Sequence, residues 1–115
     1  MTNRIFKCSI CGNVIEFLRL NQPVIICCGK PMEEITEASS EEEHSVKIEN
    51  NRVKIGKGEH PMTKEHYIEW IEATDGKEIS KVFLKPGEKP IGEFSFEPTS
   101  ARAFCSFHGL LRSSD

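Results

Sequence analysis

Alternating apolar and polar residues over the last two thirds of the chain predict short β-strands. Val46 and Ile48 alternate with charged residues, and the alternation resumes after Asn50-Asn51, which can form a tight turn. Further turn signals stand at Asp75-Gly76 and Pro86-Gly87. Turns spaced about every 8 to 12 residues are typical of an antiparallel sandwich or barrel. The pattern therefore predicts an all-β domain.

The segment MTKEHYIEWIEA allows two structures. Tyr67, Ile68 and Ile71 would form one stripe of a helix, whereas His66, Ile68 and Trp70 would alternate along a strand. The neighbouring predicted strands favour a strand. Tyr67 and Trp70 are interpreted as packing residues rather than redox groups.

The beginning of the chain has a different character. Residues 1–36 hold four of the five cysteines and are too few to bury a stable core without a staple. Residues 37–43, EASSEEE, are small or acidic and lack apolar periodicity, which predicts an exposed linker. We therefore expect three segments: a cysteine-rich module over 1–36, a linker over 37–43 and a β-domain over 44–115.

Composition narrows the class of protein. The 115 residues are 37% hydrophobic and 29% charged, as expected for a globular domain, and a net charge of -3 without a basic patch gives no basis for nucleic-acid binding. No apolar run is long enough for a membrane span or a signal peptide, so a cytoplasmic location is expected. Cysteines in such a chain are better interpreted as metal ligands or reactive thiols than as disulfides.

The first candidate metal site consists of Cys8, Cys11, Cys27 and Cys28. Four thiolates arranged tetrahedrally suit zinc or a single iron, and a structural zinc site is the simpler interpretation. The second pair is adjacent rather than spaced as Cys-x-x-Cys. Two neighbouring sulfurs can bind one metal only through an opened sulfur-metal-sulfur angle.

The second candidate site combines the remaining cysteine with all four histidines of the chain. Any one of these residues alone would be ordinary, but two pairs flank probable turns, GEHPMTKEH and CSFHG, and can converge on one end of a sandwich. Four imidazoles and one thiolate would leave one position of an iron open. A thiolate opposite that position donates electron density, as in haem-thiolate enzymes. The set is His44, His60, His66, Cys105 and His108.

The motifs resemble those of one known family. CSICG and CCGKPM resemble desulforedoxin and the N-terminal domain of desulfoferrodoxins, and GEHPMTKEHYIEW with CSFHG looks like the iron domain of superoxide reductases. The resemblance implies a seven-stranded immunoglobulin-like sandwich and two irons per chain, with zinc a possible substitute at the four cysteines. It also implies that His44, His60, His66 and His108 are equatorial ligands and that Cys105 is axial.

The same resemblance implies an activity and partners. Superoxide reductases reduce superoxide by one electron to hydrogen peroxide without releasing dioxygen, and they are re-reduced by rubredoxin or a similar carrier. The two-iron members are homodimers, so a homodimer is expected here. Two other functions remain open: a non-catalytic electron carrier or metal-binding protein, and a scaffold that binds a partner.

The sequence departs from the family before the first histidine. Where superoxide reductases commonly carry Glu-Lys-His-x-Pro, this chain reads EEHSV. Glu42 keeps the glutamate that can occupy the open position, but Glu43 replaces the lysine that attracts the anionic substrate. Lys47 and Lys64 are the nearest candidates to replace that positive charge. The acidic run either repels superoxide or is a solvated linker without effect.

Overall fold

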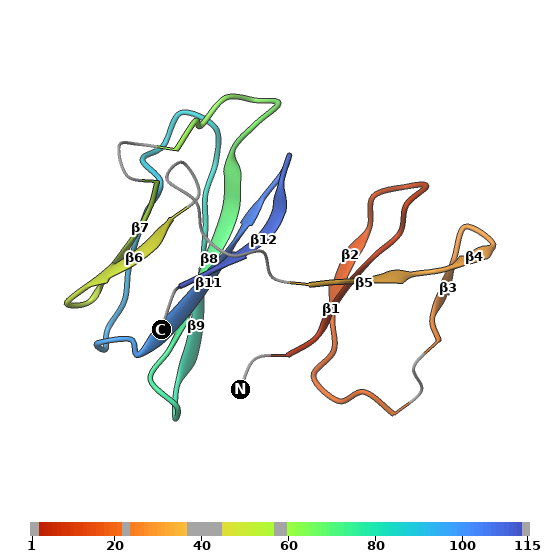
Figure 1. Cartoon of the computed structure of the whole chain (residues 1–115), viewed down its shortest axis with the longest axis horizontal. Coiled ribbons are helices and arrows are strands. Elements are labelled where there is room, and N and C mark those ends of the chain that lie inside the picture. Colours follow the sequence, from red (N-terminus) through yellow and green to blue (C-terminus); the bar gives the residue numbers. More distant parts are fainter. Residues whose placement is uncertain (1–2, 22–23, 37–44, 57–59, 114–115) are drawn as a thin grey trace. The chain divides into compact units, whose positions relative to one another are not determined.

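The protein contains strands, turns and irregular segments, and no helix among the residues that the structure describes. The computed structural model describes residues 3–21, 24–36, 45–56 and 60–113. The chain divides into two compact units, Met1–Thr36 and Glu37–Asp115 (Figure 1). The expected all-β class, with a small N-terminal module followed by a sandwich, is confirmed. Within the described ranges, no helix could cross a membrane.

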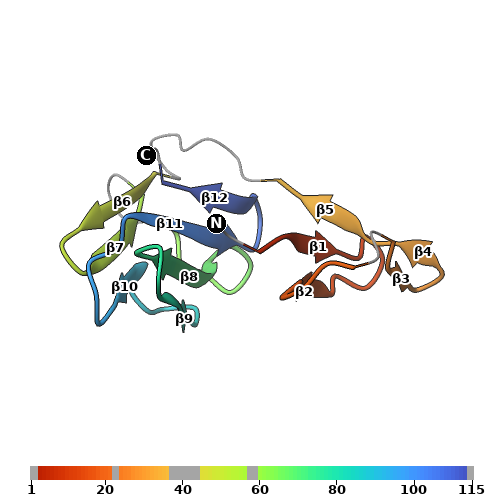
Figure 2. The same cartoon turned by 90° about the horizontal axis from the view of Figure 1, so that it is seen from below.

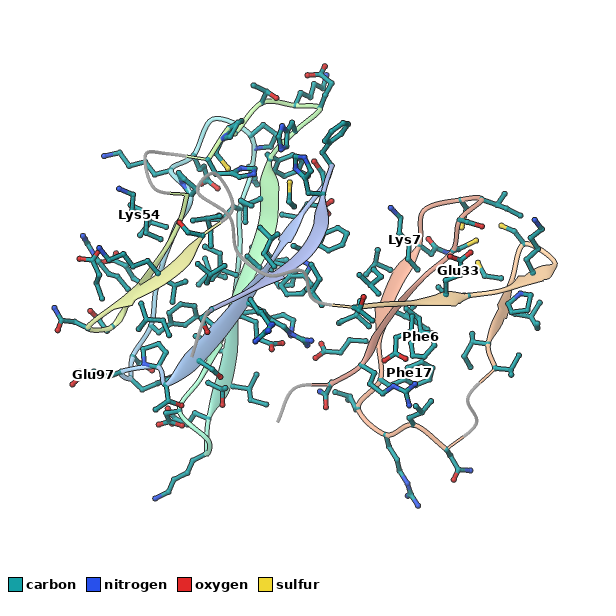
Figure 3. All side chains as sticks on the ribbon, viewed as in Figure 1. Phe6, Lys7, Phe17, Glu33, Lys54 and Glu97 are labelled. Carbon is teal, nitrogen blue, oxygen red and sulfur yellow. The ribbon has the colours of Figure 1, made fainter. Side chains whose placement is uncertain are left out.

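The first unit is built from five short strands. Three of them form an antiparallel sheet in the order β2-β1-β5, and the other two pair as a hairpin. A small core of Phe6, Cys8 and Met32 lies behind the sheet, and Phe6 packs edge-on against Phe17 with ring centroids 5.0 Å apart (Figure 3). A core of this size needs further stabilisation. The strands are β1 (Ile5–Lys7), β2 (Val14–Glu16), β3 (Ile26–Cys27), β4 (Lys30–Pro31) and β5 (Glu33–Ile35).

The second unit is a sandwich of two antiparallel sheets, ordered β10-β7-β6 and β12-β11-β8-β9 (Figure 2). In immunoglobulin constant domains the fourth strand belongs to the sheet of the first two. Here the fourth strand of the unit, β9, pairs with the third, β8, so the second sheet has four strands. The strands are β6 (Val46–Glu49), β7 (Arg52–Ile55), β8 (Ile68–Thr74), β9 (Ile79–Phe83), β10 (Ile91–Glu93), β11 (Ser100–Cys105) and β12 (Gly109–Arg112).

The ambiguous segment forms strand β8, and its register explains the ambiguity. Phe104 pairs with Trp70 and Cys105 pairs with Ile68, so Glu69 is the extra residue of a β-bulge. Because of the bulge, Ile68 and Ile71 both reach the sandwich core although they are three residues apart. That spacing is what gave the sequence its helical stripe. Cys105 is fully buried in the same core.

The opposite face of β8 carries a buried ion pair. Arg102 of β11 donates to Glu72 through Nε at 2.7 Å and Nη2 at 3.2 Å, and Lys81 of β9 also bonds this carboxylate. Glu72 and Arg102 are 1% and 3% exposed. Trp70 stacks on Phe104 beside them, with the Lys81 ammonium 5.3 Å from the Trp70 ring. These charges tie together three adjacent strands of the sheet, β11, β8 and β9.

Candidate metal centres

Four cysteines of the first unit converge on one point. Their sulfurs all lie within 4.8 Å of one another, and those of Cys11 and Cys27 are 3.6 Å apart. Each pair comes from its own turn: Cys8 and Cys11 follow β1, while Cys27 and Cys28 end β3 and begin the next turn. The structure thus brings together the whole set that the sequence indicated, with a donor arrangement that fits a tetrahedral thiolate-bound metal.

The adjacent cysteines are explained by a tight hairpin turn. Cys27 pairs with Lys30, so Cys28 and Gly29 form the two-residue loop between β3 and β4. Both have a positive φ, of 52° and 76°, as a type I′ turn requires. The turn directs Cys28 back toward Cys27, so no spacer residues are needed between the two ligands. Sequence reasoning missed this turn because cysteine rarely adopts a left-handed conformation.

The pKa values of two of the four thiols are shifted in opposite directions. Backbone N–H groups of Cys11 and Ile10 donate to the Cys8 sulfur and lower the pKa of that thiol to about 6. Hydrogen bonds with the sulfurs of Cys11 and Cys8 raise the pKa of Cys28 to about 12. The amide of Asn13 also donates to the Cys27 sulfur at 3.7 Å. A metal that binds here at neutral pH must therefore displace the proton of Cys28, while Cys8 is already a thiolate.

We expect metal affinity at this group to fall as the pH falls. Binding releases the Cys28 proton over the whole neutral range, and below about pH 6 it must also displace the proton of Cys8. The slope of log affinity against pH should therefore increase by about one below that pH, because one more proton is released on binding. Competition for Zn²⁺ between the metal-free protein and a chelator measures this affinity at each pH. An affinity unchanged between about pH 5 and 8 would contradict the expected proton release.

A second group forms at one end of the sandwich. The donor atoms of His60, His66, Cys105 and His108 lie within 4.8 Å of one another. Two of the histidines stand on the connection from β7 to β8, the cysteine ends β11, and His108 lies in the turn before β12. The Cys105 sulfur is 3.5 Å from Nε2 of His60 and 3.7 Å from Nδ1 of His108.

The tautomer of His60 is fixed by its neighbour. Its Nδ1 lies 2.7 Å from the carbonyl oxygen of Pro61, which can only accept a hydrogen bond. Nδ1 therefore carries the proton, and the lone pair of the neutral ring is on Nε2, the atom nearest Cys105. A metal-bound histidine usually makes such a second hydrogen bond. The group accordingly fits a metal held by imidazoles and one thiolate.

Burial changes from one side of this group to the other. Cys105 is 0% exposed and His60 is 2% exposed, whereas His66 is half-buried and His108 is exposed. The ring of Phe107, 72% exposed, lies 5.3 Å from that of His66 and 4.9 Å from that of His108. The Cys105 sulfur thus lies at the closed end of the group, and His108 lies at the surface.

Of the other predicted site residues, the structure describes the two lysines, whereas Glu42 and His44 lie outside the described residues. Lys47 is exposed on β6, and its Nζ is 3.8 Å from a carboxylate oxygen of Glu49, which offsets part of its charge. Lys64 is exposed two residues before His66.

Comparison with known proteins gives matches along the whole chain. The family model described as "Desulfoferrodoxin" matches residues 30–114, and "Desulfoferrodoxin, N-terminal domain" matches residues 1–35. A "Desulfoferrodoxin homolog" of Archaeoglobus fulgidus is 40% identical, covering 96% of this chain and 95% of its own. The "Desulfoferrodoxin" of Nitratidesulfovibrio vulgaris is 39% identical, covering 91% and 90%.

A solved structure shows the same fold. The superoxide reductase from Treponema pallidum superposes with a TM-score of 0.78 and covers 97% of this chain and 98% of its own. Sequence identity is 21%, so the likeness supports a shared architecture.

Proposed function

Because the chain belongs to the desulfoferrodoxin family, we propose that it is a superoxide reductase. The reaction consumes one superoxide, one electron and two protons and yields one hydrogen peroxide, with no dioxygen. The observation that carries the proposal is the buried Cys105 sulfur facing a set of histidines that reaches the surface. A thiolate behind a metal that is accessible from the other side suits chemistry on a small oxygen species.

The proposed metals are two irons per chain. The first is held by the four cysteines, where zinc is a possible substitute, and the second by His60, His66, Cys105 and His108. His44, by resemblance to the family, supplies the fourth imidazole. Iron bound at the second site would supply the electron that superoxide takes up. Cys105 holds that metal through a sulfur shielded from water, and the Pro61 carbonyl keeps His60 in the tautomer that can ligate.

Further residues are proposed to act on the substrate side. By resemblance to the family, Glu42 would occupy the open position in the resting oxidised protein, and Lys47 and Lys64 would provide positive charge for the approach of superoxide. Both lysines are exposed, so they can act through the field around the site rather than by direct contact.

Reversing the charge of Glu43 tests whether the acidic run slows the substrate. We expect Glu43→Lys to raise the second-order rate constant with superoxide about two- to ten-fold at low ionic strength, since it replaces repulsion by attraction. The gain should vanish near 1 M salt, where the Debye length is about 3 Å. Stopped-flow measurements across ionic strength provide the test.

Glu97→Lys is the matched control for this charge reversal. Glu97 is exposed and precedes β11, whose far end is Cys105, so it lies at the other end of the sandwich (Figure 3). Equal rate constants for the two variants and the unchanged protein would show that the acidic run is an inert linker.

The surface of the first unit supports the proposed homodimer. Among the described residues of this unit, five large apolar side chains are exposed: Ile10 by 57%, Val14 by 37%, Leu18 by 87%, Val24 by 58% and Ile26 by 61%. Association with a second copy of the chain would remove these apolar side chains from water. We further propose that residues 37–43 form a linker between the two units. The five free cysteines are consistent with a cytoplasmic location, which we also propose. Rubredoxin or a similar small carrier is the proposed electron donor.

Metal analysis with visible spectroscopy tests the assignment against its alternatives. The proposal expects two irons per chain and a thiolate-to-iron absorption band from the second site after oxidation. A passive electron carrier would show iron at the four cysteines and no reaction with superoxide. Two zincs and no colour in protein made with ample iron would favour a scaffold.

A further inference from the structure

The segment that carries His66 belongs to no strand, so other contacts must hold it. Residues 60–67 are the part of the β7–β8 connection that leads into β8. The backbone N–H of His66 donates to the carbonyl and the hydroxyl of Thr63, both at 3.2 Å, and the His66 carbonyl accepts from the Thr63 N–H at 2.9 Å. These bonds are local. They close a turn around His66 but do not fix it relative to Cys105.

The connection to the cysteine is made by Ser106. Its N–H donates to the Tyr67 carbonyl at 2.9 Å, and its hydroxyl accepts from the Tyr67 N–H at 3.1 Å. The same hydroxyl donates to the Glu65 carbonyl at 3.4 Å. Ser106 thus bonds the residues immediately before and after His66, and it is itself the residue after Cys105.

The bonds of Ser106 lie just beyond the β-bulge in the ladder between β8 and β11. The ladder between β8 and β11 shifts register at the Glu69 bulge and continues through the Cys105–Ile68 pair, the last pair before Ser106 and Tyr67. Beyond Ile68 the hydroxyl of Ser106 takes the place of a ladder partner. The hydroxyl oxygen, accepting on one side and donating on the other, therefore adds to the Ser106 N–H bond in setting the spacing between the His66 and Cys105 backbones.

We propose that Ser106 is a positioning residue that holds His66 at the distance from Cys105 at which both bind one metal. The inference rests on the proposed His/Cys iron site. Partners behind metal ligands commonly affect affinity about 10- to 100-fold when removed. Ser106 is half-buried and Glu65 is exposed, so water can solvate the groups released by removal of the hydroxyl. Ser106→Ala should therefore fold, and its defect should appear at the metal.

The experiment compares iron release from three variants of the iron-loaded chain with both metal sites present. Ser106→Ala removes the hydroxyl, and Ser106→Thr keeps it. Thr99→Ala is the matched control, because it removes a hydroxyl that donates to the Thr74 carbonyl at 3.3 Å at the opposite end of the same two strands. Ferrous iron is released to a chelator, and the thiolate-to-iron band of the oxidised protein is recorded. The four-cysteine iron of the same chain serves as the internal reference.

We expect iron release from the His/Cys site of Ser106→Ala to be about ten-fold faster or more, with a shifted thiolate band. Ser106→Thr and Thr99→Ala should behave like the unchanged protein, and the four-cysteine iron should not respond. Equal release and an identical band in Ser106→Ala would overturn the role of Ser106 alone. If the unchanged protein binds iron only at the four cysteines, both the proposed function and this inference fail.

Discussion

Replacing Cys105 with serine is expected to abolish superoxide reduction, lowering the rate constant by more than about a hundred-fold. The sulfur is fully buried and is the one sulfur donor of the second group. A hydroxyl in its place remains protonated and donates little electron density to a metal. The loss should exceed the roughly 10- to 100-fold that removal of a residue behind a ligand typically costs.

The visible spectrum separates this effect from unfolding. Cys105→Ser should lose the thiolate band of the second site and keep the absorption of the four-cysteine iron. The matched variant Cys28→Ser should show the opposite, because the two groups lie in different units of the chain. Retention of activity and of the band in Cys105→Ser would remove Cys105 from the iron site.

Replacing Glu72 with alanine is expected to destabilise the sandwich by about 3–5 kcal/mol, the usual cost of breaking a buried ion pair. Glu72 is 1% exposed and accepts two hydrogen bonds from Arg102, which is 3% exposed. Its removal leaves the guanidinium buried without that carboxylate. The chain's single tryptophan, Trp70, lies two residues away on the same strand, so its fluorescence reports unfolding in denaturant.

Glu93→Ala is the control for this change. Glu93 pairs with Arg52 at 3.1 Å, but both side chains are exposed, by 64% and 60%. Exposed pairs typically contribute about 0–1 kcal/mol, so little destabilisation is expected. A similar small effect from both substitutions would mean that the buried pair contributes no more than a surface pair.

Much of the fold could be predicted because local patterns coincide with its strands. The hairpin at Asn50-Asn51 is present, with Glu49 paired to Arg52, and the alternating residues Val53 and Ile55 are fully buried. The pattern left helix and strand undecided only at β8, where the bulge gives two core residues a helical spacing. A bulge depends on the partner strand, so a single segment cannot reveal it.

The two donor groups could be predicted for a different reason. Cysteine and histidine are scarce in this chain and cluster in short motifs, so their convergence could be expected from turns alone. The contacts that hold these ligand residues in place could not be predicted. The left-handed Cys28, the Pro61 carbonyl behind His60 and the hydroxyl of Ser106 depend on backbone geometry that carries no distinctive sequence signal.

The product balance of the reaction tests the central claim most directly. The iron-loaded, reduced protein is mixed with less than one equivalent of superoxide per second-site iron, and hydrogen peroxide and dioxygen are both measured. A superoxide reductase yields one hydrogen peroxide for each superoxide consumed and no dioxygen, with Cys105→Ser giving no reaction above background. Release of one dioxygen for every two superoxides would show dismutation instead and would contradict the proposed function.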